Sequence, residues 1–151
     1  MLHHTHILDV NPAGQVAISI EQLWTGLILR ITEQTQFTVG LDRVDILEQS
    51  DTQYRRALHF GSHIVYDRVF CTPNQSIEFV TDETESVPSG RLLIRILNDD
   101  ELRLSFEYIT EFPEPSNDEE RQLLGMVKAA YVAADTDTVR IIRELVSHTR
   151  H

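Results

Sequence analysis

Hydrophobic side chains follow a helical spacing towards both ends of the chain and a strand spacing through its middle. Between residues 21 and 32 apolar side chains recur every three or four positions, which predicts a helix with one buried face. Ser19 and Gln22 have the spacing of a capping box, so this helix should begin after Ser19. Gly26 interrupts it at a cost of about 1 kcal/mol relative to alanine, so we expect another element to pack closely there.

From residue 41 the apolar spacing changes from about 3.6 to 2, which indicates β-strands. The chain also begins with a segment around Ile7 and Leu8 that is typical of a short first strand. In the last two predicted strands, apolar residues alternate with largely polar ones, as in an antiparallel sheet with one covered face. The six strands predicted after residue 41 lie at 42–49, 54–60, 63–71, 76–81, 91–98 and 102–110.

A long helix is predicted at the C-terminal end, starting from a second capping box formed by Ser116 and Glu119. With nearly thirty residues it would be over about 40 Å long, enough to cross a whole sheet. Its predicted inward stripe is Leu124, Val127, Tyr131, Ala134, Thr138, Ile141 and Leu145. The order of elements predicts an α+β helix-grip fold. A curved antiparallel sheet of about seven strands would wrap around the long C-terminal helix, with a short helical region after the first strand.

The hairpin at residues 54–70 predicts a specific ion pair. A two-residue turn at Gly61-Ser62 would place Arg56 opposite Asp67, on the same face as apolar Leu58 and Val65, and that face should point inward. A three-residue turn would remove the pair. Two interpretations remain open. Arg56, held by Asp67, anchors a carboxylate or polar head group, or the pair is a structural one at a rim that solvent reaches.

The last helix contains four weak helix formers in a row, Asp135 to Thr138. We expect Asp137 to pair with Arg140 and Thr138 to bond a carbonyl one turn back. Asp135 can face a cavity or bond an arginine of the sheet. The pattern favours a role in tying helix to sheet, with ligand contact and catalysis as alternatives.

Several aromatic residues are candidates for lining a cavity. Tyr54, Tyr108 and Tyr131 fall on inward phases, where a tyrosine hydroxyl needs a partner. Trp24 in the first helix is either a core residue or a platform for a ligand. Arg30 on the same helix is interpreted as an arginine whose stem crosses apolar surface while its charge meets a nearby acid.

Charge and cysteine content narrow the choice of partners. The chain has 13 basic and 24 acidic residues, a net charge of -11, so nucleic-acid partners and membrane insertion are not expected. Cys71 is the only cysteine, and no signal peptide is recognised, so we expect a cytoplasmic protein without an internal disulfide. His3, His4 and His6 lack the companions of a designed metal site, so no metal or other cofactor is expected.

Four segments resemble the AtaL-like branch of the START-like superfamily, also called SRPBCC or birch-pollen-allergen-like: EQLWTGLILRI, VDILEQSD, LHFGSHIVYDRV and AADTDTVRIIREL. The resemblance extends over residues 8–145 and implies one START-like domain at residues 1–151 with an apolar cavity between the sheet and the C-terminal helix. The wider superfamily includes lipid carriers, hormone receptors, aromatic polyketide cyclases and ring-hydroxylase subunits, so the fold does not select a function.

Two functional hypotheses are compatible with these patterns. The first is a binding or carrier protein for a hydrophobic or amphipathic small molecule. The alternative is a cyclase, aromatase or dehydratase-type enzyme for a polyketide-like or aromatic substrate. No catalytic residue is assigned, because no titratable pair has a spacing that demands proton transfer. An Asp67 or Tyr108 with a strongly perturbed pKa inside a closed pocket would favour the enzyme. An interaction module with a filled core is a third hypothesis, and a homodimer is compatible with the pattern. The predicted ligand-binding residues are Arg56, Asp67, Tyr108, Tyr131, Asp135 and Trp24.

Overall fold

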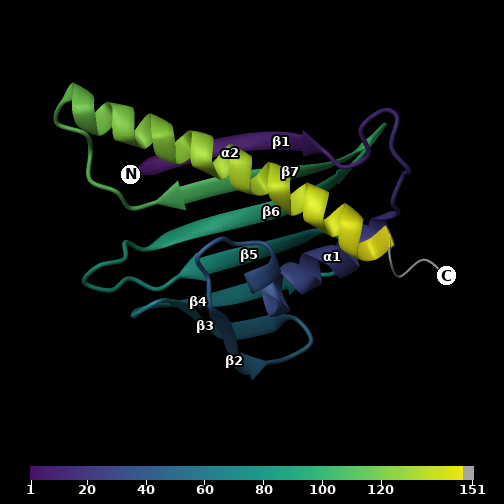
Figure 1. The fold of residues 1–151 in the computed structure, drawn as a ribbon, viewed down its shortest axis with the longest axis horizontal. Coiled ribbons are helices and arrows are strands. Elements are labelled where there is room, and N and C mark those ends of the chain that lie inside the picture. Colours follow the sequence, from purple (N-terminus) through teal and green to yellow (C-terminus); the bar gives the residue numbers. More distant parts are fainter. Residues whose placement is uncertain (148–151) are drawn as a thin grey trace.

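Seven strands form one antiparallel sheet in the order β1-β7-β6-β5-β4-β3-β2, and two helices cross one of its faces (Figure 1). The computed structural model describes residues 1–147, so the last four residues of the predicted domain lie outside the described part. The elements are β1 (Leu2–Asp9), α1 (Ile20–Thr32), the 3-10 helix η1 (Gln34–Gln36), β2 (Arg43–Gln49), β3 (Gln53–Phe60), β4 (His63–Thr72), β5 (Ser76–Thr81), β6 (Gly90–Asn98), β7 (Leu102–Thr110) and α2 (Asp118–Ser147).

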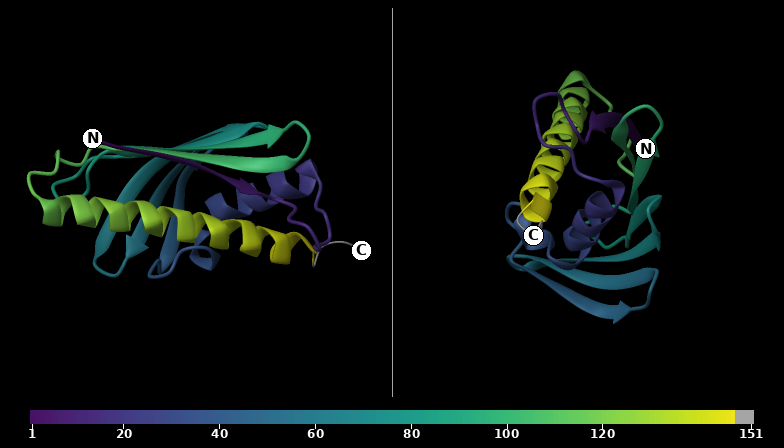
Figure 2. Two further views of the ribbon diagram at one scale, coloured as in Figure 1. Left: turned by 90° about the horizontal axis from the view of Figure 1, so that it is seen from above. Right: turned by 90° about the vertical axis from the view of Figure 1, so that its right-hand side faces the viewer.

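The predicted helix-grip architecture is confirmed. The six strands after residue 41 agree with their predicted bounds to within one residue, and β1 is longer than the short strand expected at Ile7 and Leu8. Seen end-on, the sheet curves around α1, and α2 lies across its open side (Figure 2). The buried core lies between this concave face and the two helices. Among the described helices, none is both long enough and apolar enough to cross a membrane.

Helix α1 begins as predicted and is closely packed against α2. The capping box is present: Ser19 accepts a hydrogen bond from the Gln22 backbone, and the Gln22 side chain accepts one from the Ser19 backbone. A Cβ added to Gly26 would lie 2.3 Å from Cγ2 of Ile142 on α2. Gly26 therefore permits a close approach of the two helices, which fixes the position of α1 beneath α2.

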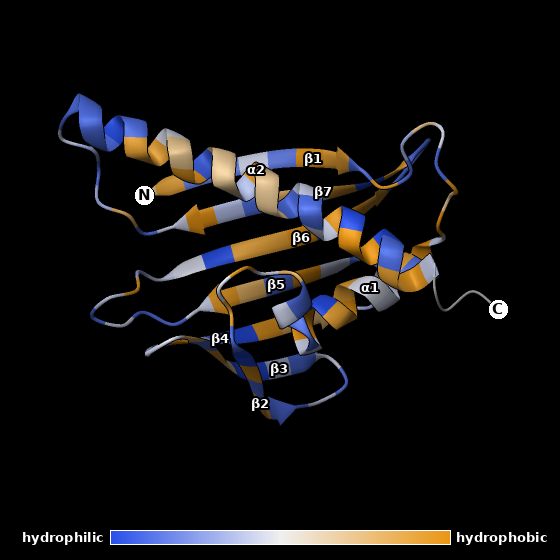
Figure 3. Cartoon of the chain, in the orientation of Figure 1, coloured by the Kyte–Doolittle hydropathy of each residue, from blue (hydrophilic) through white to orange (hydrophobic). Residues whose placement is uncertain are grey.

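Two predictions about α2 were wrong by one residue. Asn117, not Ser116, accepts the hydrogen bond from the Glu120 backbone, and Glu120 rather than Glu119 accepts hydrogen bonds from Ser116. The inward stripe was also misplaced, because Ala134 is exposed while its neighbour Asp135 is completely buried. Apolar spacing favoured alanine over a carboxylate, but the packing of the helix against α1 and the sheet sets its rotation. Figure 3 shows hydrophobic and hydrophilic residues alternating along the C-terminal half of α2.

Candidate functional site

Seven polar side chains lie on the concave face of the sheet and on the helices that cover it; we call them the buried polar cluster. Their positions follow from strand register, since His4 pairs with Tyr108 across β1 and β7, and Arg56 pairs with Asp67 across β3 and β4. Residues on one face of a sheet alternate, so His6 follows His4 onto this face. The cluster consists of His4, His6, Arg30, Arg56, Asp67, Tyr108 and Asp135.

The predicted Arg56–Asp67 pair is present in the predicted register. Arg56 donates to both carboxylate oxygens of Asp67, at 2.9 Å from Nε and 2.6 Å from Nη2. Its Nη1 donates to the Ile31 carbonyl and to Oε1 of Gln34, both at 2.8 Å. Arg56 is 1% exposed and Asp67 is 3% exposed, so the interpretation of a solvent-reached rim pair was wrong. The pair ties β3 and β4 to the end of α1, and its contact with a ligand stays a prediction.

Arg30 differs from Arg56 because it has no hydrogen-bond or ion-pair partner among the described residues. It is 9% exposed, and its buried Nε has no hydrogen-bond partner among the described residues. The expected pairing with a nearby acid was wrong, because Arg30 forms no ion pair among the described residues. Tyr108 and Asp135 nevertheless lie close enough to Arg30 for electrostatic interactions that favour its charged form. Its guanidinium lies over the ring of Phe79, 5.0 Å from the centroid, a geometry that stabilises a cation. Burial lowers the pKa of Arg30, yet an arginine remains charged in proteins.

Asp135 is held at the centre of the cluster by a tyrosine and a histidine. The hydroxyl of Tyr108 donates to its carboxylate, at 2.8 Å from Oδ1 and 2.7 Å from Oδ2. Nε2 of His6 lies 3.0 Å from Oδ2, although its N–H is not aligned for a hydrogen bond. The alternative of a sheet arginine was wrong. Burial raises the pKa of Asp135 to about 7, against the lowering effects of the Tyr108 hydrogen bond and of Arg30.

Tyr108 is the other strongly perturbed group. Burial raises the pKa of its hydroxyl, and the neighbouring Asp135 carboxylate raises it further. Tyr108 is therefore strongly perturbed, whereas the closed pocket around it that the enzyme hypothesis also requires stays a prediction. The contacts of Tyr108 and His6 with Asp135 were not expected. Tyr131 stacks on Tyr108 with ring centroids 3.8 Å apart, and is itself half-buried.

The remaining expectations for the weak helix formers are confirmed. Thr138 donates from its hydroxyl to the Ala134 carbonyl at 3.1 Å, one turn back. Arg140 donates to Asp137 at 3.4 Å. Trp24 is half-buried and packs against the hydrophobic core, as expected if it is a core residue. Its role as a ligand platform stays a prediction.

Sequence reasoning missed His6 because the three N-terminal histidines were considered only as metal ligands. His4 and His6 are in contact, with Nε2 of His4 2.8 Å from Nδ1 of His6. The alternation of His4, His6 and Leu8 on one strand face was the signal that could have found them. Within residues 1–147, no group of three or more His, Cys, Asp or Glu side chains is arranged to hold a metal ion.

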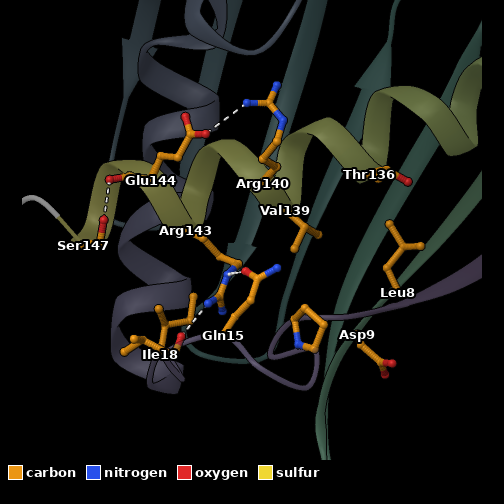
Figure 4. A pocket seen from close by; sticks show the side chains of 12 residues that line it. Leu8, Asp9, Gln15, Ile18, Thr136, Val139, Arg140, Arg143, Glu144 and Ser147 are labelled. Carbon is orange, nitrogen blue, oxygen red and sulfur yellow. Dashed lines mark hydrogen bonds and ion pairs between the residues drawn. The ribbon is translucent and has the colours of Figure 1, made fainter.

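A cavity of about 620 Å³ lies beside α2, where the connection from β1 to α1 passes the helix (Figure 4). Arg143 of α2 holds this connection: it donates to Gln15 Oε1 at 3.0 Å, to the Val10 carbonyl at 2.9 Å, to Asn11 Oδ1 at 2.8 Å and to the Val16 carbonyl. The cavity is lined by Leu8, Asp9, Pro12, Gln15, Val16, Ile18, Thr136, Val139, Arg140, Arg143, Glu144 and Ser147.

None of the seven residues of the buried polar cluster lines this cavity, but residues that neighbour cluster members on β1 and α2 do. Leu8 follows His6 on the same strand face, and Val139 follows Asp135 by one helical turn. Its walls next to the cluster are apolar, because Leu8, Ile18 and Val139 belong to the hydrophobic core or pack against it. Apolar walls are typical of small-molecule sites, whereas Arg30 and Asp135 lie outside the lining of this cavity.

Comparison with known sequences gives one family. A sequence profile described as AtaL, acetylaranotin biosynthesis cluster protein L, matches residues 4–149. No curated protein matches the chain in sequence.

Comparison with solved structures gives proteins of the same fold. The Zhui aromatase/cyclase from Streptomyces sp. R1128 is 21% identical with a TM-score of 0.67; the match covers 99% of this chain and 96% of that one. The di-domain aromatase/cyclase StfQ of the steffimycin biosynthetic pathway is 10% identical with a TM-score of 0.75 over 97% of this chain and 51% of its own. Ara h 8.0201 is 12% identical with a TM-score of 0.59, and the match covers 94% and 99% of the two chains. At these identities the likeness establishes the fold alone.

Proposed function

Because this chain belongs to the AtaL family, whose fold it shares with aromatase/cyclases, we propose that it binds an amphipathic small molecule through Arg30. The ligand has an apolar body and one anionic or strongly accepting oxygen group. The observation that carries the proposal is the buried guanidinium of Arg30, whose Nε has no acceptor among residues 1–147. An unpaired buried cation is unfavourable in the free protein, so a ligand acceptor restores the missing interaction.

Arg30 is a better candidate for this anchor than Arg56. Four N–H groups of Arg56 already donate to Asp67, Ile31 and Gln34, which leaves little donor capacity for a ligand. Arg30 lies near Asp135 and Tyr108, and Asp135 precedes Val139, which lines the cavity beside α2, by one helical turn. We therefore place the polar end of the ligand at Arg30 and its apolar part towards Leu8 and Val139.

The experiment compares wild type, Arg30→Met and the exposed-site control Arg121→Met by native mass spectrometry and thermal shift. The ligand panel contains fatty acids, aromatic carboxylates and polyketide-like compounds, together with their uncharged esters. Loss of a charged hydrogen bond of about 1.5–3 kcal/mol predicts a roughly 10- to 100-fold weaker affinity in Arg30→Met. Arg121→Met should bind like wild type. Equal binding by all three proteins would reject the anchor.

A second candidate function is favoured by the contact of Asp135 with Tyr108 and His6. A carboxyl group that titrates near neutral pH is suited to general acid–base chemistry. In an aromatase/cyclase-type reaction, the Asp135 carboxylate would accept a proton from a methylene between two carbonyls. Arg30 would bind the enolate oxygen that forms, and the enolate carbon would attack a ketone carbon of the same chain. The protonated Asp135 would return its proton to the new alkoxide before water is lost.

The enzyme is tested by incubating the protein with a synthetic poly-β-ketoacyl thioester and analysing the products by mass spectrometry. Ring closure followed by dehydration lowers the substrate mass by one water. Asp135→Asn should retain binding and lose conversion, because its amide cannot accept the proton. Equal product yields with wild type, Asp135→Asn and no protein would leave the carrier function as the one supported.

A further inference from the structure

The contact between His4 and His6 extends the buried polar cluster towards solvent. Half-buried His4 meets His6 at 2.8 Å, His6 lies 3.0 Å from Asp135, and Asp135 accepts from Tyr108 at 2.7 Å. His4 and His6 come from β1, Asp135 from α2 and Tyr108 from β7, whereas Arg30 approaches the same carboxylate from α1. A series of closely spaced proton-carrying groups thus extends from half-buried His4 to the carboxylate near the unpaired arginine.

We propose that His4, His6 and Asp135 form a proton switch, through which an anionic group bound at Arg30 is accompanied by one proton taken from solvent. This inference rests on the proposed function, since it requires the anion to bind at Arg30. It adds to that function a coupling between ligand binding and proton uptake, and it assigns a role to two histidines.

The switch has two hydrogen-bonding directions. In the ionised state His4 donates from Nε2 to Nδ1 of His6, and His6 presents its Nε2–H to the Asp135 carboxylate. When a proton reaches Nδ1 of His4, the Nε2 proton of His4 moves to Nδ1 of His6, and the Nε2 proton of His6 moves to Oδ2 of Asp135. Asp135 then donates to His6, and His6 donates to His4. One proton has entered, and both histidines have exchanged the Nε2–H tautomer for the Nδ1–H tautomer.

The charges around Asp135 favour this coupling. Tyr108 from β7, His6 from β1 and Arg30 from α1 face the carboxylate, and His4 lies near Lys128 and His3. Burial lowers the pKa of both His4 and His6, so the pair remains neutral and can relay a proton without holding a charge. A ligand anion beside Arg30 would add a second negative charge near Asp135, and protonation of Asp135 removes that repulsion.

The geometry of the His6–Asp135 contact is compatible with a switch rather than a fixed bond. Nε2 of His6 and Oδ2 of Asp135 are 3.0 Å apart, but they form no hydrogen bond in this structure. Such loose contacts are common in ligand-free sites and tighten when the site is filled. His6 also stacks on Phe106 at a centroid distance of 5.3 Å, which orients its ring along the seam between β1 and α2.

The test uses 8-anilinonaphthalene-1-sulfonate, a fluorescent aromatic anion, as the probe. Its binding is measured at pH 7.5 by calorimetry in Tris and in phosphate, buffers whose ionisation enthalpies differ. The wild type should take up about half to three-quarters of a proton per probe molecule, because Asp135 is about three-quarters ionised before binding. Asp135→Asn should bind the probe without uptake. Arg30→Met tests the proposed function separately: if it binds the probe as wild type does, the anchor itself is rejected.

Nitrogen-15 NMR of the histidine rings provides a direct readout that requires no variant of Asp135. Probe binding at pH 7.5 should convert His4 and His6 from the Nε2–H to the Nδ1–H tautomer, and acidification of the free protein to about pH 6 should do the same. Signals are assigned from His4→Gln and His6→Gln, and exposed His63 serves as an internal control. Arg30-dependent probe binding without a tautomer change or proton uptake would overturn the switch and leave the anchor intact.

Discussion

Two arginines lie over the same phenyl ring in the core but differ in their partners. The guanidinium of Arg56 is 5.3 Å from the centroid of Phe79, and that of Arg30 is 5.0 Å from it. Arg56 forms a two-point ion pair with Asp67 and bonds two further acceptors at the end of α1. The Nε of Arg30 has no acceptor in the described part of the chain.

The difference separates a structural arginine from a functional one. A buried cation with all its main donors paired fixes the relative position of the elements that it joins. A buried cation without a partner weakens the folded state. Proteins keep such unfavourable buried groups at functional sites. The four predictions below test this distinction, beginning with the largest expected change in stability.

Substitution Arg56→Met should lower the free energy of unfolding by about 3–5 kcal/mol, because it leaves Asp67 buried without its counter-charge. Urea denaturation followed by circular dichroism measures the change. The double variant Arg56→Met/Asp67→Leu removes both charges and should recover much of the loss. A single variant as stable as wild type would show that the pair does not hold β3 and β4 to α1.

The pH dependence of stability tests whether Asp135 belongs with Arg30 in the functional part of the cluster. Its pKa is about 7 in the folded protein, above the usual value of 3.8 for an aspartate. A raised carboxyl pKa means that the folded state holds its proton more tightly, so this stabilisation is present below about pH 4 and is lost as pH rises towards 7. The loss amounts to about 4 kcal/mol at most.

The measurement is urea denaturation of wild type and Asp135→Asn at pH 4.5, 6 and 7.5. The asparagine can still accept from Tyr108, but it does not titrate. Wild type should therefore lose stability relative to Asp135→Asn across this range. A constant difference between the two proteins would mean that Asp135 has an ordinary pKa and would place it with the structural residues.

The structural arginine was predictable from sequence and the functional one was not. The register of a two-residue hairpin places Arg56 opposite Asp67, since local turn geometry fixes which side chains share a face. No comparable local rule predicts the surroundings of Arg30. Its lack of an acid partner depends on how α1 docks onto the sheet, and the spacing of the helix reveals only that Arg30 adjoins apolar residues.

The same limit explains the missed neighbours of Asp135. Residues 134 and 135 differ by about 100° around a helix axis, and apolar content favoured Ala134 for the inward position. His6 and Tyr108 belong to strands whose pairing links the two ends of the chain. The strand spacing predicted the inward face of Tyr108, but it could not predict which side chains meet α2 above the sheet.

Substitution Gly26→Ala tests the packing that positions Arg30. The added methyl group would lie 2.3 Å from Cγ2 of Ile142, so the helices must separate despite the better helix propensity of alanine. We expect a loss of about 1–3 kcal/mol, measured by urea denaturation. The double variant Gly26→Ala/Ile142→Ala makes room on the facing helix, so the added methyl group should be less destabilising there than in the wild-type background. Full stability of Gly26→Ala would contradict the close contact.

Substitution Arg30→Met should have the smallest effect on stability, within about 1 kcal/mol of wild type. The change keeps most of the apolar stem over Phe79 and removes an unpaired charge, whose desolvation opposes folding. Arg56→Met introduces the same side chain at the other arginine, so the two variants measured together in urea isolate the effect of pairing. A loss above about 2 kcal/mol in Arg30→Met would mean that folding depends on Arg30 as it does on Arg56. If Arg30→Met keeps its stability and loses ligand binding, Arg30 has a functional role and Arg56 a structural one.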